Sequence, residues 1–154
     1  MIREKTIDHA LRATWKAVTK LYNEEASKHD STMAMAMALL YIDHEKGTPS
    51  TSLGPSMGME ATSLSRLLKN LEDRELIYRV KNPNDGRGVF LKLTNKGKEM
   101  RTISKISVLN FNETIRKNIS EEKINIFFEV IDLIAKLINE KSFFNITPET
   151  KLQK

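Results

Sequence analysis

The chain has 154 residues, of which 25 are lysine or arginine and 20 are aspartate or glutamate, a net charge of +5. With 40% hydrophobic and 29% charged residues, the composition argues against intrinsic disorder and favours one globular domain. Cysteine is absent, which excludes disulfides, thiol catalysis and cysteine-ligated metal centres. Since no apolar signal-peptide core or membrane-spanning stretch is present, we expect a cytoplasmic protein with no membrane partner.

The positive charge is concentrated in the middle of the chain. Residues 1–57 carry seven basic and seven acidic groups, whereas residues 58–102 carry ten and six. Within that block, residues 79–98 hold six basic groups and one acidic group, a surplus as large as that of the whole chain. Such a local surplus indicates an anionic partner.

The N-terminal segments have helical patterns. Residues 5–29 place apolar side chains at three- and four-residue steps, which predicts a long amphipathic helix. Residues 33–42 are apolar on every side, which predicts a buried helix that ends before Gly47 and Pro49. The methionines of this helix suit either core packing or a soft metal, and we favour core packing.

A helix-turn-helix is predicted next. Residues 50–58 form a short helix in which Pro55 is expected to be tolerated only in the first turn, and Gly58 suits the tight turn that follows. The helix over residues 60–74 has leucines on one stripe and hydroxyl or basic groups opposite, which is typical of a DNA-reading helix. The residues of that opposite face are Thr62, Ser63, Ser65, Arg66, Lys69 and Asn70.

Two short strands follow this helix. Residues 77–81 and 89–93 have strand composition, and residues 82–88 between them are rich in turn formers. The sequence therefore predicts a β-hairpin, called the wing here, with Arg87 near its tip. Arg79 and Lys81 on its first strand are either nucleic-acid contacts or positive edge residues that prevent aggregation.

Two long helices complete the predicted fold. Thr94 is expected to cap a helix that runs to about residue 118, and Ser120 to cap the last helix. The last helix has the cleanest apolar periodicity of the chain, and residues 142–154 are expected to fray. Its stripe consists of Ile124, Phe127, Phe128, Ile131, Ile134, Ala135 and Ile138.

This order of elements resembles the MarR family of bacterial transcriptional regulators over roughly residues 5–140. The stretch 76–97 is similar to the family's wing signature, with Asp-x-Arg at residues 85–87 and Leu-Thr-x-x-Gly at residues 93–97. Three features depart from the usual pattern. Gly54 and Pro55 stand where a helix commonly continues, Glu75 replaces a common glycine, and the absence of cysteine excludes thiol sensing.

The resemblance implies a mainly α fold with a small β-hairpin wing (α+β), in which a winged helix-turn-helix lobe sits on a helical dimerisation domain. Within a single domain 1–154, the lobe is expected over residues 32–99. The dimerisation helices are expected over 5–30 and 100–141, with their apolar faces forming the seam. The implied partner is a pseudo-palindromic double-stranded DNA operator, bound by a homodimeric repressor that a small aromatic or phenolic ligand releases.

Site residues follow from matching positions in the family. Thr62, Ser63, Ser65, Arg66 and Lys69 would lie on the recognition helix, with Arg79 and Lys81 nearby on the wing. Arg87 would enter the minor groove, and Asp85 would hold the wing through a salt bridge. Trp15, Tyr22 and Tyr41 are candidates for an effector pocket, although aromatic residues on apolar faces also suit the core. Taken alone, Arg66 and Lys69 could equally be solvated helix charges.

Other functions are weighed against this interpretation. The alternative is a dimeric winged-helix adaptor that binds protein rather than DNA, and the basic window over residues 79–98 counts against it. Catalytic motifs and a glycine-rich phosphate loop are missing, so we expect neither an enzyme nor a cofactor. Asp43, His44 and Glu45 are consecutive helix-end residues that point in different directions, so we expect no metal site.

Overall fold

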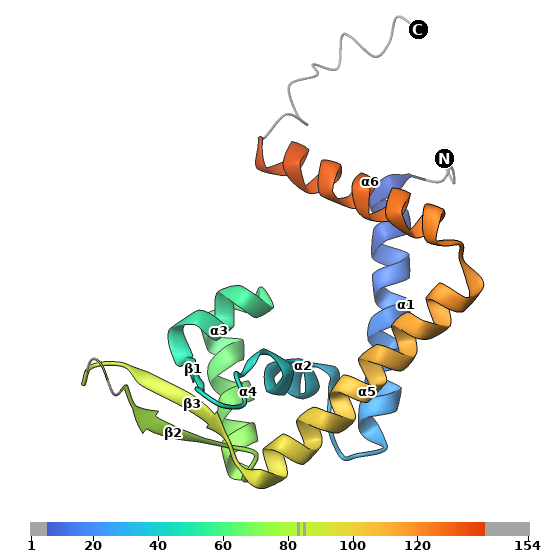
Figure 1. Ribbon diagram of the computed structural model, residues 1–154. Helices are drawn as coiled ribbons and strands as arrows, with labels where there is room; N and C mark the ends of the chain where they lie inside the picture. Colours follow the sequence, from blue (N-terminus) through green and yellow to red (C-terminus); the bar gives the residue numbers. More distant parts are fainter. Residues whose placement is uncertain (1–5, 83, 85, 141–154) are drawn as a thin grey trace, which may run out of the picture. The chain divides into compact units, whose positions relative to one another are not determined.

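The computed structural model describes residues 6–82, 84 and 86–140 (Figure 1). The fold is mainly helical with one small antiparallel sheet, as predicted. The chain divides into two compact units, Met1–Leu109 and Asn110–Lys154, and the division falls within the sequence of one helix. The elements are α1 (Ile7–Ser27), α2 (Met33–Tyr41), β1 (Thr48–Pro49), α3 (Ser50–Met57), α4 (Ala61–Asp73), β2 (Ile77–Lys81), β3 (Val89–Leu93), α5 (Asn95–Asn118) and α6 (Glu121–Asn139).

The core of the first unit joins α2, α3 and α4 to the sheet. Leu39, Leu53, Leu71 and Leu91 are completely buried in it, one from each of these elements. The prediction of a buried α2 is confirmed for one of its faces, whereas Met37 on another face is only half-buried. This core fixes α4 and the hairpin relative to each other, because both contribute side chains to it.

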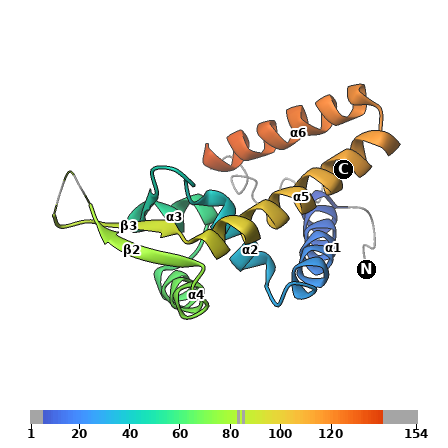
Figure 2. The same cartoon turned by 60° about the horizontal axis from the view of Figure 1, so that its bottom comes forward.

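The sheet has the strand order β1-β3-β2. β2 and β3 form the predicted hairpin, in a register that runs from Ile77 opposite Leu93 to Lys81 opposite Val89. The two-residue strand β1 was not predicted, since it has no alternating pattern to reveal it. Figures 1 and 2 both show the hairpin extending past α2 and α4, away from the helices of this unit.

Three helices of the first unit end in the same way. In each case a residue with positive φ follows the last turn: Asp30 (φ 53°), Gly58 (φ 63°) and Glu75 (φ 58°). The next N–H then bonds to a carbonyl five residues back, which is the Schellman pattern. These bonds are Ser31 to Ala26, Met59 to Gly54 and Leu76 to Leu71. Gly58 was predicted here, whereas an L side chain at the other two positions adds about 1 kcal/mol of strain.

The expectation for Pro55 is wrong, because this proline occupies the sixth position of α3. A proline there removes one helical hydrogen bond to the carbonyl of Thr51. Thr51 and Pro55 are both exposed, so water can solvate that carbonyl, and the helix ends only two residues later. Beside it, Gly54 is buried at a close approach, where a Cβ would lie 3.2 Å from Leu64 Cδ2.

The caps of the last two helices differ from each other. Thr94 caps α5 as predicted: its Oγ1 accepts a hydrogen bond from Gly97 N (2.9 Å) and donates one to the carbonyl of Glu75 (2.6 Å). Ser120 occupies the N-cap position of α6, but its side chain makes no capping bond, so that part of the prediction is wrong. In the same first turn, Glu121 pairs with Arg116 at 2.8 Å.

Helix α6, in the second unit, has two apolar faces. Of the predicted stripe, Ile124 is buried and Ile131 and Ile134 are half-buried, whereas Phe127, Phe128 and Ile138 are 49–58% exposed. A second stripe at three- and four-residue steps is 43–52% exposed. It consists of Ile126, Val130, Leu133 and Leu137.

Candidate nucleic-acid interface

The solvent-facing side of α4 carries the hydroxyl and basic groups. Leu68 and Leu71 hold the opposite side of the helix in the core. All six side chains predicted for the outer face are exposed, and they lie on one side because the helical repeat separates them from the leucines. They are Thr62, Ser63, Ser65, Arg66, Lys69 and Asn70. α4 thus presents hydrogen-bonding groups and positive charge together on one exposed face.

The C-terminal end of α4 is tied to two other segments through Arg74. Its guanidinium donates hydrogen bonds to the carbonyl of Asp30 and, at 3.7 Å, to Sδ of Met35. The carbonyl of Arg74 accepts a hydrogen bond from Lys96 Nζ at 3.0 Å. The end of the helix is therefore linked both to the α1–α2 loop and to the start of α5.

The first strand of the wing is also tied to α4. Arg79 Nε lies 2.8 Å from Glu72 Oε1, in an ion pair between β2 and α4 whose side chains are 43% and 30% exposed. Both predicted basic residues of the strand are exposed, and Arg79 in addition has an acidic partner on α4. This pair is not apparent in the sequence, because seven residues and a change of secondary structure separate the partners.

The tip of the wing carries Arg87, which is exposed. Asn82 N donates to the carbonyl of Gly88 at 2.8 Å, and Asn82 Oδ1 accepts from Asn84 N at 2.9 Å, so the loop is closed at its base. Asp85 lies outside the described residues, and its role in holding the wing stays a prediction.

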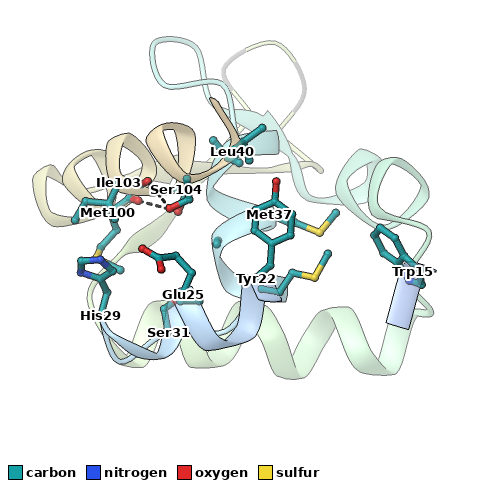
Figure 3. A pocket seen from close by; sticks show the side chains of 15 residues that line it. Trp15, Tyr22, Glu25, His29, Ser31, Met37, Leu40, Met100, Ile103 and Ser104 are labelled. Carbon is teal, nitrogen blue, oxygen red and sulfur yellow. Dashed lines mark hydrogen bonds between the residues drawn. The ribbon is translucent and has the colours of Figure 1, made fainter. Parts of the chain in front are cut away.

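A separate cavity of about 210 Å³ lies between α1, α2 and the first half of α5, all within the first unit. Figure 3 shows Trp15 at one end of it and Glu25, His29 and Ser31 at the other. Of the three predicted aromatic residues, Trp15 and Tyr22 line the cavity, whereas Tyr41 does not belong to its lining among the described residues. Its remaining lining residues are Ala26, Met33, Ala36, Met37, Leu40, Met100, Ile103, Ser104, Ser107 and Val108.

The polar end of the cavity contains groups with different partners. Glu25 Oε2 lies 2.5 Å from Lys28 Nζ, and this hydrogen bond and charge hold the pKa of the Glu25 carboxyl below its usual range. Ser104 Oγ donates to the carbonyl of Met100 at 2.8 Å. Ser31 Oγ is buried and has no hydrogen-bond partner in the structure. Near the middle, burial raises the pKa of the Tyr22 phenol.

The described part of the chain contains neither a cluster of metal-ligating side chains nor a membrane-spanning helix. No three histidine, aspartate or glutamate side chains converge there on a position for a metal ion. Asp43 accepts hydrogen bonds from the backbone N–H groups of Lys46 (2.8 Å) and Glu45 (2.9 Å), which lower the pKa of its carboxyl. Of the helices described, none combines the length and apolarity needed to span a membrane.

Comparisons with known proteins agree with this geometry. The MarR family model matches residues 31–89, which include the helix-turn-helix and the start of β3. The regulator SarZ of Staphylococcus aureus strain USA300, named an HTH-type transcriptional regulator, is 30% identical over 125 residues, covering 80% of this chain and 78% of SarZ.

Solved structures share the fold. The Staphylococcus aureus MepR–DNA complex superimposes with a TM-score of 0.79 at 21% identity, covering 86% of this chain and 98% of that one. PcaV of Streptomyces coelicolor with its natural ligand gives 0.73 at 22% identity, covering 88% and 98%. SarZ and PcaV are both named transcriptional regulators. The chain therefore belongs to the MarR family of winged-helix transcriptional regulators.

Proposed function

We propose that this protein is a homodimeric repressor that binds a specific double-stranded DNA operator. The observation that carries the proposal is the exposed hydroxyl and basic face of α4, which lies beside an arginine-tipped wing. Support also comes from MepR, which shares the fold and whose structure was solved with DNA. An exposed helix of this composition fits the major groove of B-form DNA, and a narrow hairpin reaches the adjacent minor groove.

Each side chain of the interface has a distinct expected role. Arg66 can donate two hydrogen bonds to guanine, the commonest specific contact in the major groove. The hydroxyls of Thr62, Ser63 and Ser65 can bond to phosphates or base edges. Arg87 suits the negative potential of a narrow minor groove. Because Arg79 is paired with Glu72, we assign it to holding the wing against α4 more than to contacting DNA.

The proposal of a dimer rests on apolar side chains that the protomer leaves exposed. On α1, Ile7, Leu11 and Leu21 are 41–67% exposed, and α6 exposes its second stripe. Contiguous exposed apolar side chains are often part of an interaction surface. Two-fold pairing through them would present two copies of α4 about 34 Å apart to a pseudo-palindromic site.

Release by a small molecule is proposed through the cavity of the first unit. PcaV, whose fold is similar, was solved with a natural ligand. In this chain the loop that carries His29 and Ser31 also supplies the carbonyl that Arg74 binds at the end of α4. An occupant that displaces the loop would therefore shift the C-terminal end of the recognition helix.

Two arginine variants test the DNA interface. Arg66→Ala is expected to weaken binding to the operator by about 10- to 100-fold and to relax base preference, since a bidentate contact contributes about 1–3 kcal/mol. Arg87→Ala is expected to weaken binding and to lower the slope of log affinity against log salt by about one. Fluorescence anisotropy with labelled duplex DNA over a salt series measures both quantities.

Lys117→Ala is the matched control, because it removes one exposed positive charge in the second unit, where Lys117 pairs with Glu113. It should leave affinity and salt slope close to those of the wild type. If Arg66→Ala and Arg87→Ala behave like this control, α4 and the wing are not the DNA interface. If the wild type itself shows no salt-dependent binding to duplex DNA, the protein-binding adaptor is the better explanation.

A further inference from the structure

The composition of the cavity indicates which kind of molecule fits it. One end is apolar, with Trp15, Tyr22 and Met37, and thioether and aromatic groups of this kind pack well around a ring. The other end offers a carboxylate, an imidazole and a hydroxyl from Glu25, His29 and Ser31. None of the lining residues in the described part of the chain is a lysine or arginine.

Ser31 is the side chain of the cavity with an unmet hydrogen bond. Its residue is 9% exposed, and its Oγ is buried without a hydrogen-bond partner. Such groups are rare in folded proteins because an unmet hydrogen bond is unfavourable. The backbone here is fixed, since Ser31 N bonds to the carbonyl of Ala26 and Arg74 holds the preceding carbonyl. A polar group of a bound ligand could therefore form a hydrogen bond with Ser31 Oγ without a change in the backbone.

Glu25 sets the charge that such an occupant can carry. A glutamate carboxyl is ionised at neutral pH, and the hydrogen bond and the charge of Lys28 lower the pKa of this one further. Lys28 is 66% exposed at its side chain, does not line the cavity and already binds Oε2 of Glu25. An ionised carboxylate has about four acceptor positions, so Glu25 can still accept from a donor inside the cavity. A carboxylate ligand at this end would face a like charge, which is unfavourable.

The size of the cavity limits the occupant to one ring with a short chain. Its volume of about 210 Å³ is larger than the roughly 150 Å³ of an engineered cavity that binds benzene. It is smaller than the roughly 300–1,000 Å³ of pockets for drug-sized ligands.

We infer that the cavity binds a compact aromatic amine in its protonated form, in preference to an aromatic carboxylate. The ring lies among Trp15, Tyr22 and the methionines, and the ammonium donates to Glu25 and Ser31. This inference rests on the proposed function, because it names the ligand of the proposed effector site. It also narrows the ligand class implied by the family resemblance, in which aromatic acids are common.

Three ligands of nearly equal shape test the inference: 2-phenylethylamine, 2-phenylethanol and phenylacetate. Trp15 is the only tryptophan of the chain and lines the cavity, so its fluorescence reports binding directly. We expect the full-length protein to bind the amine at least 10-fold more tightly than phenylacetate, with the alcohol between them. Glu25→Gln should reduce the difference between amine and alcohol to about twofold or less, and Ser31→Ala should weaken amine and alcohol alike, by about fivefold.

Glu24→Gln is the control, since Glu24 is the neighbouring exposed carboxylate, pairs with Lys20 and does not line the cavity. It should leave the order of the three ligands unchanged. Phenylacetate binding as tightly as the amine, or an unchanged preference in Glu25→Gln, would overturn the inference. So would the absence of any binding, which would also remove the cavity as an effector site. If the amine binds as expected but leaves DNA affinity unchanged, the ligand class stands and the proposed release mechanism fails.

Discussion

The Gly97→Ala variant is expected to be about 3 kcal/mol less stable than the wild-type protein. A Cβ at this position would lie 1.9 Å from the carbonyl oxygen of Leu76 and 2.9 Å from its carbonyl carbon. Leu76 cannot move aside easily, because its N–H bonds to Leu71 and its carbonyl accepts from Thr94 N. The start of α5 would have to separate from the turn after α4, which disturbs the packing of the lobe.

This outcome is the opposite of the usual one, since alanine in a helix is normally more favourable than glycine by about 0.5–1 kcal/mol. Urea denaturation followed by circular dichroism measures the difference. Gly86→Ala is the matched control, because a Cβ there meets no atom within 4 Å, and its stability should stay within about 0.5 kcal/mol of the wild type. A Gly97→Ala protein as stable as this control would show that α5 does not pack against Leu76 as described.

The Leu133→Asp variant is expected to dissociate the proposed dimer, raising its dissociation constant by about 1,000-fold. Leu133 is 52% exposed and lies at the centre of the second apolar stripe of α6, so the protomer itself loses little packing. In a two-fold interface the substitution occurs twice. Burial of an unpaired carboxylate at about 2 kcal/mol each gives about 4 kcal/mol in total. Analytical ultracentrifugation over a concentration series measures the change.

Asn125→Asp serves as the control, since it adds the same charge on the polar face of α6, beside the position of Glu129. It should remain a dimer at the concentrations where Leu133→Asp is a monomer. A wild-type protein that sediments as a monomer would contradict the dimer outright. A dimeric Leu133→Asp protein would instead place the interface away from this stripe.

Much of the fold was predictable because its signals are local. The leucine stripe of α4, the turn residues between β2 and β3, and the threonine that caps α5 each act within a few residues of their own position. The boundaries of the helices accordingly fall within a few residues of the predicted ones. The face of α4 was predictable for the same reason, since helical periodicity alone separates Arg66 and Lys69 from the leucines.

Other features depend on contacts between distant segments. The ion pair of Arg79 with Glu72, the approach of Gly97 to Leu76 and the pairing of β1 with β3 arise only once the lobe is folded. The lining of the cavity likewise depends on how three helices pack together. Helical periodicity alone therefore could not show that Tyr41, unlike Trp15 and Tyr22, does not belong to the lining in the described part of the chain. The residues of the second stripe of α6 also recur at helical spacing. The first stripe alone was enough to predict an amphipathic helix, so the second was not recognised as a separate apolar face.

Selection of binding sites from random duplex DNA by the purified 154-residue chain tests whether it reads a two-fold symmetric operator. A homodimer that reads DNA with α4 and the wing predicts a two-fold symmetric consensus whose half-sites are about one helical turn apart. The wing further predicts preference at the flanking positions, which Arg87→Ala should weaken while leaving the central half-sites recognisable. Recovery of no consensus, or of an asymmetric single half-site, would contradict DNA recognition by a homodimer through α4 and the wing.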